Sequence, residues 1–407
     1  MSIILHSDLN NFYATCECLL NPNLNGKPVV VCGKIKDRHG IVLAKNYLAK
    51  GAGIKTGMTI YEATKLIDGL VAIEAKHDLY FKYSRLVKNI YRDYTDKIES
   101  FGIDEAWLDV TDVVNKYGSG ENIANIIRER VKKEIGLTVS IGVSFNKVFA
   151  KLGSDMKKPD AVTVISKENF KDTIWKLPVE ELLYVGRATL SKFNDLGIFT
   201  IGQLANFDKK ILKLKLGKCG EYLYDYANGL DNSEVRSDIE GREIKSVGNS
   251  LTFYRDIKTI EDVATLIFLL ADSVAVRMKE DDIKCARTVR LWVEDNEMYS
   301  FVHQSKLSHG SNCATEIGEK ALEMFKKEYM WSKPIRALGV SVCDFSECEQ
   351  IDFYTTNEKR QKIESLEKAI LDVRKRYGVN SINRGLVLSD IKFTQLNING
   401  ANTLWPD

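Results

Sequence analysis

Hydrophobic and polar positions repeat with two different periods along the chain, and these periods predict its elements. Strand-like apolar runs occur at residues 2–5, 27–33 (KPVVVCG), 99–110 (ESFGIDEAWLDV) and 137–144 (LTVSIGVS). Between them, LYFKYSRLVKNIYRDYT and ENIANIIRERVKKEI carry apolar residues at helical spacing. Strands separated by helices predict an α/β unit over about the first 165 residues.

The pattern changes twice further along the chain. From about residue 170 to 232, short helical segments are broken by glycines, and no strand pattern is present. Residues 231–243 are charged and lack periodicity, which is typical of a linker. An α+β domain is predicted from residue 244, with strands at 246–253, 286–294 and 335–345 around two helices. A further helix, EKRQKIESLEKAILDVRKRYG, is expected near the C-terminus.

Composition narrows the class of protein. A chain of 407 residues predicts several domains, and a net charge of +2 shows no overall basic excess for nucleic acid. The eight cysteines are scattered without a C-x-x-C pair, which argues against a disulfide framework or zinc site. No signal peptide or membrane-spanning run is evident, so we expect a cytoplasmic protein without membrane partners.

Acidic residues at two apolar runs raise the question of a metal site. Asp8 follows the first run, and the pair Asp104-Glu105 interrupts another, as in a hairpin or at a strand edge. If the two strands are neighbours, the three carboxylates converge and require divalent cations, for which Mg²⁺ or Mn²⁺ is suited. Two alternatives remain open from the residues alone: Asp8 could cap a helix over residues 10–20, and Asp104-Glu105 could be a solvated turn.

Four motifs in order resemble the Y-family, or UmuC/DinB-like, lesion-bypass DNA polymerases: SDLNNFYA, GIVLAKNYLAKGAGIKTGM, GIDEAWLD and SIGVSFNKVFAKLGSDMKKP. The resemblance covers residue 1 to about 345. It implies a multidomain α/β and α+β right-hand fold with palm, small fingers, a helix-hairpin-helix thumb and a little finger. The implied boundaries are palm 1–18 and 74–166, fingers 19–73, thumb 167–232, linker 233–243, little finger 244–345 and tail 346–407.

The resemblance also implies roles in nucleotide binding and catalysis. Asp8, Asp104 and Glu105 match the catalytic metal-binding acids, with two Mg²⁺ ions and the backbone carbonyl of Leu9 as a further ligand. Tyr13 matches the aromatic steric gate that excludes ribonucleotides. The residues implied in triphosphate binding are Asn11, Phe12, Tyr47, Lys50 and Lys158. Lys50 replaces the usual Arg, Ala44 the usual Ser or Thr, and Gly102 the usual Ser. The Lys50 exchange keeps the charge and loses bidentate geometry.

DNA and protein contacts follow the same resemblance. Val185, Gly186 and Arg187 match the thumb turn that meets a DNA phosphate, and the lysine-rich run KKILKLKLGK adds Lys213 and Lys215. In the little finger, Arg287 and Arg290 are candidate DNA contacts. The segment QIDFY resembles the peptide that docks bacterial polymerases on the sliding clamp, through Gln350, Ile351, Phe353 and Tyr354. A strand edge packed on the little finger is the alternative for this segment.

Three functions are compared on these grounds. A template-directed polymerase of the translesion type, binding primer-template DNA and deoxynucleoside triphosphates with low fidelity and low processivity, accounts for every motif. A nucleotidyl cyclase also holds two metals on paired acids, but it needs neither a helix-hairpin-helix nor a clamp peptide. A non-catalytic DNA-binding scaffold needs no convergent carboxylates, and the chain retains all three.

Overall fold

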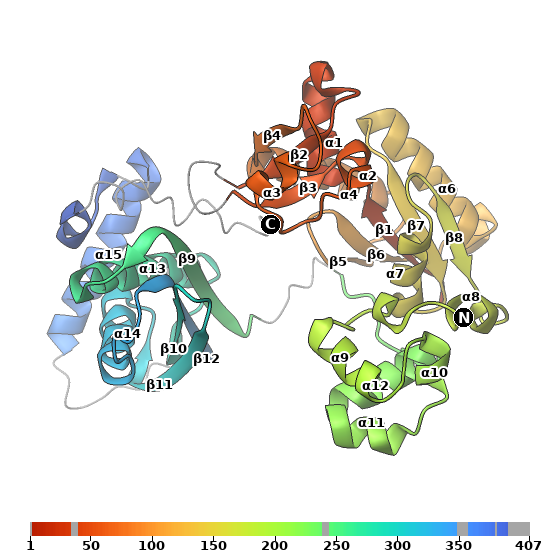
Figure 1. The fold of residues 1–407 in the computed structure, drawn as a ribbon. Helices are drawn as coiled ribbons and strands as arrows, with labels where there is room; N and C mark the ends of the chain where they lie inside the picture. Colours follow the sequence, from red (N-terminus) through yellow and green to blue (C-terminus); the bar gives the residue numbers. More distant parts are fainter. Residues whose placement is uncertain (1, 34–39, 238–243, 348–356, 379–380, 390–407) are drawn as a thin grey trace. The chain divides into compact units, whose positions relative to one another are not determined.

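The computed structural model describes residues 2–33, 40–237, 244–347, 357–378 and 381–389. The chain divides into two compact units, Met1–Ile35 with Gly40–Arg242, and Lys36–His39 with Glu243–Asp407 (Figure 1). The division between Arg242 and Glu243 falls at the end of the charged stretch that separates two patterns of hydrophobicity in the sequence.

A five-stranded sheet organises the first unit, in the order β5-β6-β1-β7-β8. The central strand β1 pairs antiparallel with β6 and β7, and β8 continues the sheet parallel to β7. All six residues of β1 are buried, as expected for a strand with neighbours on both sides. The strands are β1 (Ile4–Leu9), β5 (Ile98–Ser100), β6 (Glu105–Asp109), β7 (Val139–Ser144) and β8 (Val162–Ile165).

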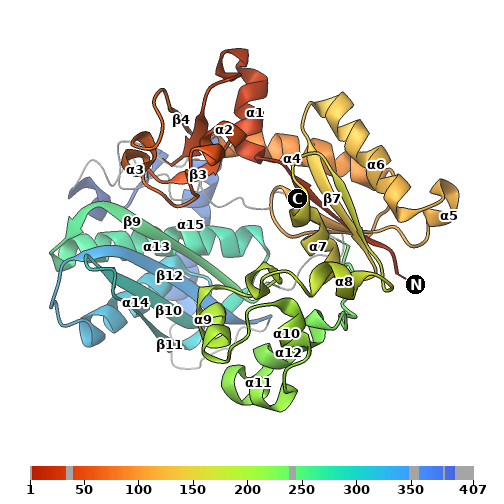
Figure 2. The same cartoon turned by 45° about the vertical axis from the view of Figure 1, so that its right-hand side comes forward.

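Helices cover both faces of this sheet (Figure 2). On one face, Leu5 and Leu9 of β1 pack with residues of α4 (His77–Arg92) and α6 (Gly120–Arg130). On the other face, Ile4 and Trp107 pack with Ala150 of α7 (Lys147–Met156). Since successive strand residues point to opposite faces, Ile4, His6 and Asp8 share the α7 face. The remaining helices of this region are α1 (Phe12–Leu20), α5 (Val114–Tyr117) and η2 (Val131–Ile135), a π-helical extension of α6.

Two smaller regions complete the first unit. A three-stranded sheet, β3-β2-β4, has its own core around Val30, Val42 and Ile54. An all-helical region follows β8 and is packed around Phe193, Leu204 and other apolar residues. The sheet region contains η1 (Pro22–Leu24), β2 (Val29–Cys32), β3 (Val42–Lys45), α2 (Tyr47–Gly51), α3 (Ile60–Thr64) and β4 (Val71–Glu74). The helical region contains α8 (Phe170–Ile174), η3 (Val179–Glu181), α9 (Arg187–Asp195), α10 (Ile201–Ala205), α11 (Lys209–Leu216) and α12 (Lys218–Ala227).

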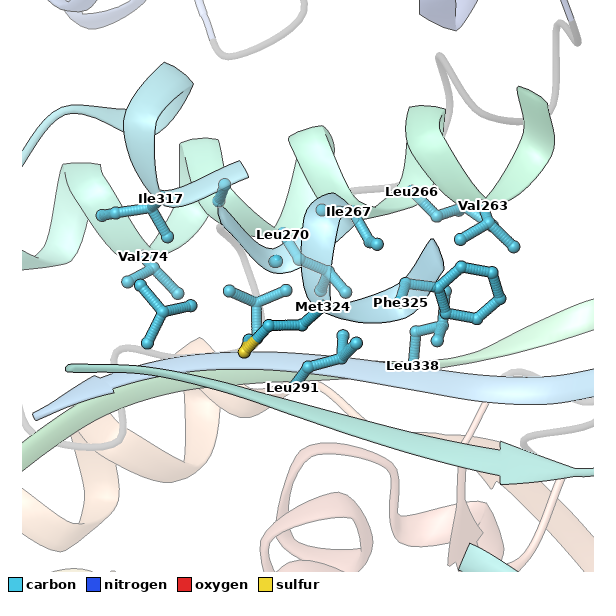
Figure 3. Packing of buried hydrophobic residues seen from close by; sticks show 14 of the residues in the cluster. Val263, Leu266, Ile267, Leu270, Val274, Leu291, Ile317, Met324, Phe325 and Leu338 are labelled. Carbon is cyan, nitrogen blue, oxygen red and sulfur yellow. The ribbon is translucent and has the colours of Figure 1, made fainter. Parts of the chain in front are cut away.

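The second unit is a four-stranded antiparallel sheet, β11-β10-β12-β9, with α13 and α14 on one face. Figure 3 shows side chains of both helices, among them Leu270 and Met324, packed against Leu291 and Leu338 of the sheet. The elements are β9 (Ser246–Ile257), α13 (Ile260–Glu280), β10 (Cys285–Asp295), β11 (Ser300–Ser311), α14 (Ala314–Glu328) and β12 (Ile335–Ser346).

The described C-terminal residues pack on this second unit. Glu367 of α15 (Asn357–Tyr377) binds Lys279 of α13 at 2.8 Å and accepts a hydrogen bond from the backbone N–H of Thr315 at the start of α14. In the segment around η6 (Gly385–Ser389), Val387 is buried in the core, and Arg384 forms a bidentate pair with Asp272 of α13. The sequence predicted the helix but did not indicate its packing partner.

The structure contains strands that the sequence analysis missed: β3, β4, β8 and β11. The first three have only four residues each, too few for a clear alternation of apolar and polar positions. The edge strand β11 alternates exposed and half-buried residues along a mainly polar sequence, SFVHQSKLSHGS. For residues 99–110, the sequence left open a hairpin or a strand edge, and the antiparallel pairing of β5 with β6 shows the hairpin.

Two observations concern membrane-spanning helices and the state of the cysteines. In the described part of the chain, no helix has the length and hydrophobicity needed to cross a membrane. The cysteines within those same ranges are all free thiols.

Candidate active site

Three carboxylates lie at one end of the central strands. In the register of β1 with β6, Asp8 is directly opposite Glu105. The backbone N–H of Leu9 donates to the carbonyl of Asp104 at 3.0 Å, which fixes the hairpin turn beside the end of β1. The expectation that the two acid-bearing strands are neighbours is therefore confirmed. The helix-cap alternative for Asp8 is excluded, because Asp8 lies within β1 and α1 is preceded by Asn11 as its N-cap.

The carboxylates differ in their surroundings. Asp8 is 8% exposed and lies on the α7 face of the sheet. Burial, together with the neighbouring charges of Glu105 and Asp8, raises the pKa of Asp104 to about 6. Burial would also raise the pKa of Glu105, but His6 and Lys151 outweigh this effect and hold it at about 2. The turn thus carries adjacent acids of different proton affinity, and Asp104 is the one that is short of positive partners.

Helix α7 reaches these carboxylates because two glycines allow it to pack directly on the sheet. A Cβ added at Gly142 of β7 would lie 1.9 Å from the carbonyl oxygen of Ala150 in α7. A Cβ at Gly153 of α7 would lie 3.1 Å from the Cα of Gly142. The side chain of Asn146 caps the helix by accepting from the N–H of Phe149, which fixes where α7 begins.

Two lysines from α7 and the residues just after it reach the acids. Lys151 Nζ lies 2.6 Å from Glu105 Oε2, 3.3 Å from Asp8 Oδ2 and 3.3 Å from Asp155 Oδ2. Lys158 Nζ lies 2.8 Å from Asp8 Oδ1 and 3.0 Å from Asp155 Oδ1. The sequence analysis named Lys158 but missed Lys151 and Asp155. Their spacing of four residues, which places both on one face of a helix such as α7, was the available signal.

The side chains do not form a preassembled metal site. Among the described residues, no group of three or more His, Cys, Asp or Glu side chains is close enough to hold a metal ion. The ammonium of Lys151 instead contacts Asp8 and Glu105 together. The sequence placed the three acids in one region, but it did not predict that a lysine lies between two of them.

The aromatic residues after Asp8 have separate environments. Phe12 is 3% exposed and belongs to the core, as ordinary packing would require. Tyr13 is half-buried and stacks on Tyr80 of α4, with ring centroids 4.1 Å apart and an interplanar angle of 11°. Tyr80 in turn donates to Glu17 Oε1 at 2.9 Å, so the stack is anchored by a buried carboxylate. Asn11 has a left-handed backbone with φ of 48° at the start of α1.

The other predicted contact residues lie on separate elements of the first unit. Tyr47 and Lys50 are exposed on α2. Val185 precedes Gly186, which is the N-cap of α9, and Arg187 is the first residue of that helix. Lys213 and Lys215 lie on α11, where Lys213 pairs with Glu221 at 2.9 Å.

In the second unit, the strand register shows which side chains lie on the face of the sheet that points away from α13 and α14. Arg290 of β10 is on this face, and its Nε donates to Gln304 of β11 at 2.9 Å. Arg287 lies at a register shift between Ala286 and Thr288. On β9, β10 and β12, the residues of this face are mostly small or hydroxylated, with Arg290, Trp292 and Glu294 as exceptions. We call these residues the open face: Ser246, Gly248, Ser250, Thr252, Thr288, Arg290, Trp292, Glu294, Ala337, Gly339, Ser341 and Cys343. The clamp-peptide residues Gln350, Ile351, Phe353 and Tyr354 lie outside the described residues.

Comparisons with known proteins cover both units. The impB/mucB/samB family model matches residues 7–155, and the model of that family's C-terminal domain matches residues 244–353. A DNA polymerase IV of Acetivibrio thermocellus is 51% identical over 391 residues, covering 95% of this chain and 98% of the relative. A DNA polymerase IV of Clostridium kluyveri is 36% identical over 399 residues, covering 96% and 99%.

A solved structure agrees with these sequence matches. It is a Y-family DNA polymerase chimera with a TM-score of 0.73 and 25% sequence identity, and the match covers 84% of this chain and 99% of that one. Together with the strand-end carboxylates, these matches define a multidomain polymerase of the right-hand type. The chain belongs to the Y-family of DNA polymerases, the impB/mucB/samB family. It is a DNA-directed DNA polymerase of the translesion type.

Proposed function

We propose that the chain adds deoxynucleotides to a primer 3′ end at Asp8, Asp104 and Glu105, with two Mg²⁺ ions. The observation that carries this proposal is the strand register: Asp8 lies opposite Glu105, and Leu9 is hydrogen-bonded to Asp104. Three acids at one strand end repel one another unless cations neutralise them. Such a site is suited to a substrate that brings both phosphates and metal ions.

The donors present fit a hard divalent cation. All three side chains offer oxygen, which Mg²⁺ prefers and Mn²⁺ accepts. Burial, together with the charges of Glu105 and Asp8, raises the pKa of Asp104, and a cation bound there would offset both effects. Within the described ranges of the chain, the buried Oε2 of Glu105 makes no hydrogen bond of good geometry, although Lys151 lies within ion-pair distance. An ion that binds Asp8 and Glu105 together must compete with the Lys151 ammonium, and the carbonyl of Leu9 would be a further ligand.

Divalent ions in this position would activate the primer hydroxyl and stabilise the pyrophosphate that leaves. The protein would bind the triphosphate through Lys158, Lys50 and Tyr47, with backbone amides of Asn11 and Phe12. Lys158 pairs with Asp8 and Asp155, so triphosphate binding through Lys158 would exchange these carboxylates for phosphate oxygens.

Tyr13 would exclude the 2′-hydroxyl of a ribonucleotide. Its stacking on Tyr80 restricts ring movement, as a steric gate requires. Phe12 is buried in the core, so its side chain is unsuited to the same role.

Primer-template DNA would be bound in both units. In the first unit, the turn at Val185 and Gly186, with Arg187, would meet a phosphate through backbone N–H groups, and Lys215 would add charge. Lys213 would have to leave Glu221 to contribute in the same way. In the second unit, the small side chains of the open face allow close approach of a DNA backbone, with Arg290 as a cation.

The names of the regions follow from the same proposal. The five-stranded sheet, three-stranded sheet, helical region and second unit would be the palm, fingers, thumb and little finger, with the boundaries given above. A cytoplasmic location is proposed with them, since the free cysteines suit a reducing compartment.

We further propose that the QIDFY segment docks on a sliding clamp, which would compensate for low intrinsic processivity. Deleting residues 350–354 should lower clamp-dependent synthesis and leave clamp-free synthesis unchanged. Loss of both would indicate a structural role for the segment instead.

Primer extension tests the central proposal. The wild-type protein, Mg²⁺ and four deoxynucleotides should extend a primer by a few nucleotides and pass an abasic site, and Asp104→Ala should not. Ribonucleotides should be rejected by the wild type. If the wild type binds DNA but fails to extend it with either Mg²⁺ or Mn²⁺, the catalytic proposal is wrong. Equal extension by Asp104→Ala would remove Asp104 from the site.

A further inference from the structure

A buried histidine lies behind the catalytic carboxylates. His6 is 0% exposed and lies on β1, two residues before Asp8 and on the same face of the sheet. Its Nε2 atom is 3.3 Å from Oε2 of Glu105, and its Nδ1 atom is 2.9 Å from the hydroxyl of Ser154 in α7. The ring also meets Trp107 edge-on, with centroids 5.2 Å apart.

These contacts fix the imidazole on three sides. Ser154 Oγ lies 2.7 Å from the carbonyl oxygen of Lys151 and 2.9 Å from His6 Nδ1, so its single hydroxyl hydrogen serves one of these two acceptors. When Nδ1 accepts it, the neutral imidazole carries its own hydrogen on Nε2, which faces Glu105. Trp107 belongs to β6 and Ser154 to α7, so the ring is held between two elements that also carry Glu105 and Lys151. A buried imidazole is costlier than an apolar side chain unless its polar atoms have partners. Here Nδ1 lies within hydrogen-bond distance of the Ser154 hydroxyl, and Nε2 lies within ion-pair distance of Glu105 without a hydrogen bond of good geometry among the described residues.

The contacts of the Glu105 carboxylate involve only one of its two oxygens in the described part of the chain. Lys151 Nζ and His6 Nε2 both approach Oε2, at 2.6 Å and 3.3 Å. Among the described residues, Oε1 has no ion pair and no hydrogen bond. A carboxylate held by one oxygen presents the other in a defined direction, which is what a metal-binding side chain needs.

We propose that His6 is a positioning residue that orients Glu105, so that the affinity of the site for divalent cations depends on it. Ser154 supports the same role by holding the imidazole from α7. The proposal rests on the assignment of Glu105 as a metal ligand under the proposed function. His6 itself does not touch the cation or the substrate.

Binding of Mn²⁺ to the full-length protein without DNA, measured by electron paramagnetic resonance, tests this role. His6→Phe keeps a ring and removes both nitrogens, and we expect about tenfold weaker Mn²⁺ binding. The Mg²⁺ concentration for half-maximal primer extension should rise by a similar factor, with the KM for deoxynucleotide little changed at saturating Mg²⁺. His6→Gln, which retains a donor toward Glu105, should recover part of the loss, and Ser154→Ala should show a smaller loss.

The second unit offers a matched control. His309 Nε2 lies 3.1 Å from Glu316 Oε2, a similar His–Glu pair far along the chain. His309→Phe should leave Mn²⁺ binding unchanged, and a loss equal to that of His6→Phe would overturn the proposal.

The outcomes separate this inference from the proposed function. If folded His6→Phe binds Mn²⁺ as the wild type does, the positioning role is wrong. If His6→Phe does not fold, unchanged Mn²⁺ binding by folded Ser154→Ala overturns it instead. If Asp104→Asn binds Mn²⁺ and extends primers normally, the assigned site itself is wrong. If Asp104→Asn loses Mn²⁺ binding while His6→Phe and Ser154→Ala bind Mn²⁺ normally, only the positioning role of His6 is wrong.

Discussion

In the part of the chain that the structure describes, the two large sheets differ in how many of their faces are covered by helices. In the first unit, α4 and α6 pack on one face of the five-stranded sheet and α7 packs on the other. In the second unit, α13 and α14 pack on one face, and the strand register assigns small and hydroxylated residues to the open face. The same strand periodicity therefore occurs in a sheet with helices on both faces and in a sheet with helices on one face.

Under the proposed function, catalysis takes place at the sheet with helices on both faces, and the open face of the other sheet binds DNA. In a sheet covered on both sides, charged side chains are confined to strand ends, where burial strengthens their interactions. Asp8, Glu105 and Lys151 meet under these conditions. A sheet with one free face can instead contact a partner over an area through many weak interactions. The predictions below test the covered sheet first and the open face last.

The largest effect is expected from Asp8→Asn, at the end of the covered sheet. It removes a proposed metal ligand and the carboxylate that pairs with both Lys151 and Lys158. Single-turnover primer extension should slow by about a hundredfold or more. Asp112→Asn, which changes an exposed acid paired with Lys97, is the control and should extend normally. Comparable rates for the two variants would contradict a special role for this strand end.

Removal of the steric gate should change selectivity more than rate. Tyr13→Ala deletes the ring that stacks on Tyr80 and opens space beside the sugar. Ribonucleotide incorporation relative to deoxynucleotide should rise by at least about tenfold, measured as a ratio of kcat/KM values. Tyr13→Phe keeps the ring and should retain the selectivity of the wild type. Unchanged selectivity in Tyr13→Ala would exclude Tyr13 as the gate.

Close packing of α7 on the covered sheet can be tested with one methyl group. Gly142→Ala would place a Cβ 1.9 Å from the Ala150 carbonyl, so the helix must shift. We expect a loss of about 1–3 kcal/mol in stability of the first unit, seen as a lower melting temperature, with slower primer extension. Gly385→Ala is the control, because its Cβ would meet nothing within 4 Å. Full stability of Gly142→Ala would show that the helix can move without cost.

The smallest effect is expected at the open face. Arg290→Ala should weaken DNA binding by a few-fold and lower the slope of affinity against salt concentration by about one. Lys326→Ala, on α14 at the opposite face, should change neither quantity. Fluorescence anisotropy over a range of salt concentrations measures both. Equal effects of the two substitutions would mean that DNA does not bind preferentially to the open face.

Much of this arrangement could be predicted from local patterns. The long helices α4 and α6, the strands β1 and β7 and the hairpin around Asp104 have clear periodicity, so their hydrophobic faces were evident. The short strands β3, β4 and β8 lacked enough residues to show a period. Strand β11 was missed because an edge strand with half-buried residues requires little hydrophobicity.

The sequence by itself determined which residues are candidates for the chemistry: acids after apolar runs, an aromatic pair beside them, and lysines in a recognisable order. Only the tertiary structure decided how these residues meet. Lys151 lies between Asp8 and Glu105 because Gly142 and Gly153 let a helix pack directly on the sheet, far along the chain from either acid. His6 joins the same site through contacts with β6 and α7. Such contacts depend on the distance between packed backbones, which no local pattern of residues records.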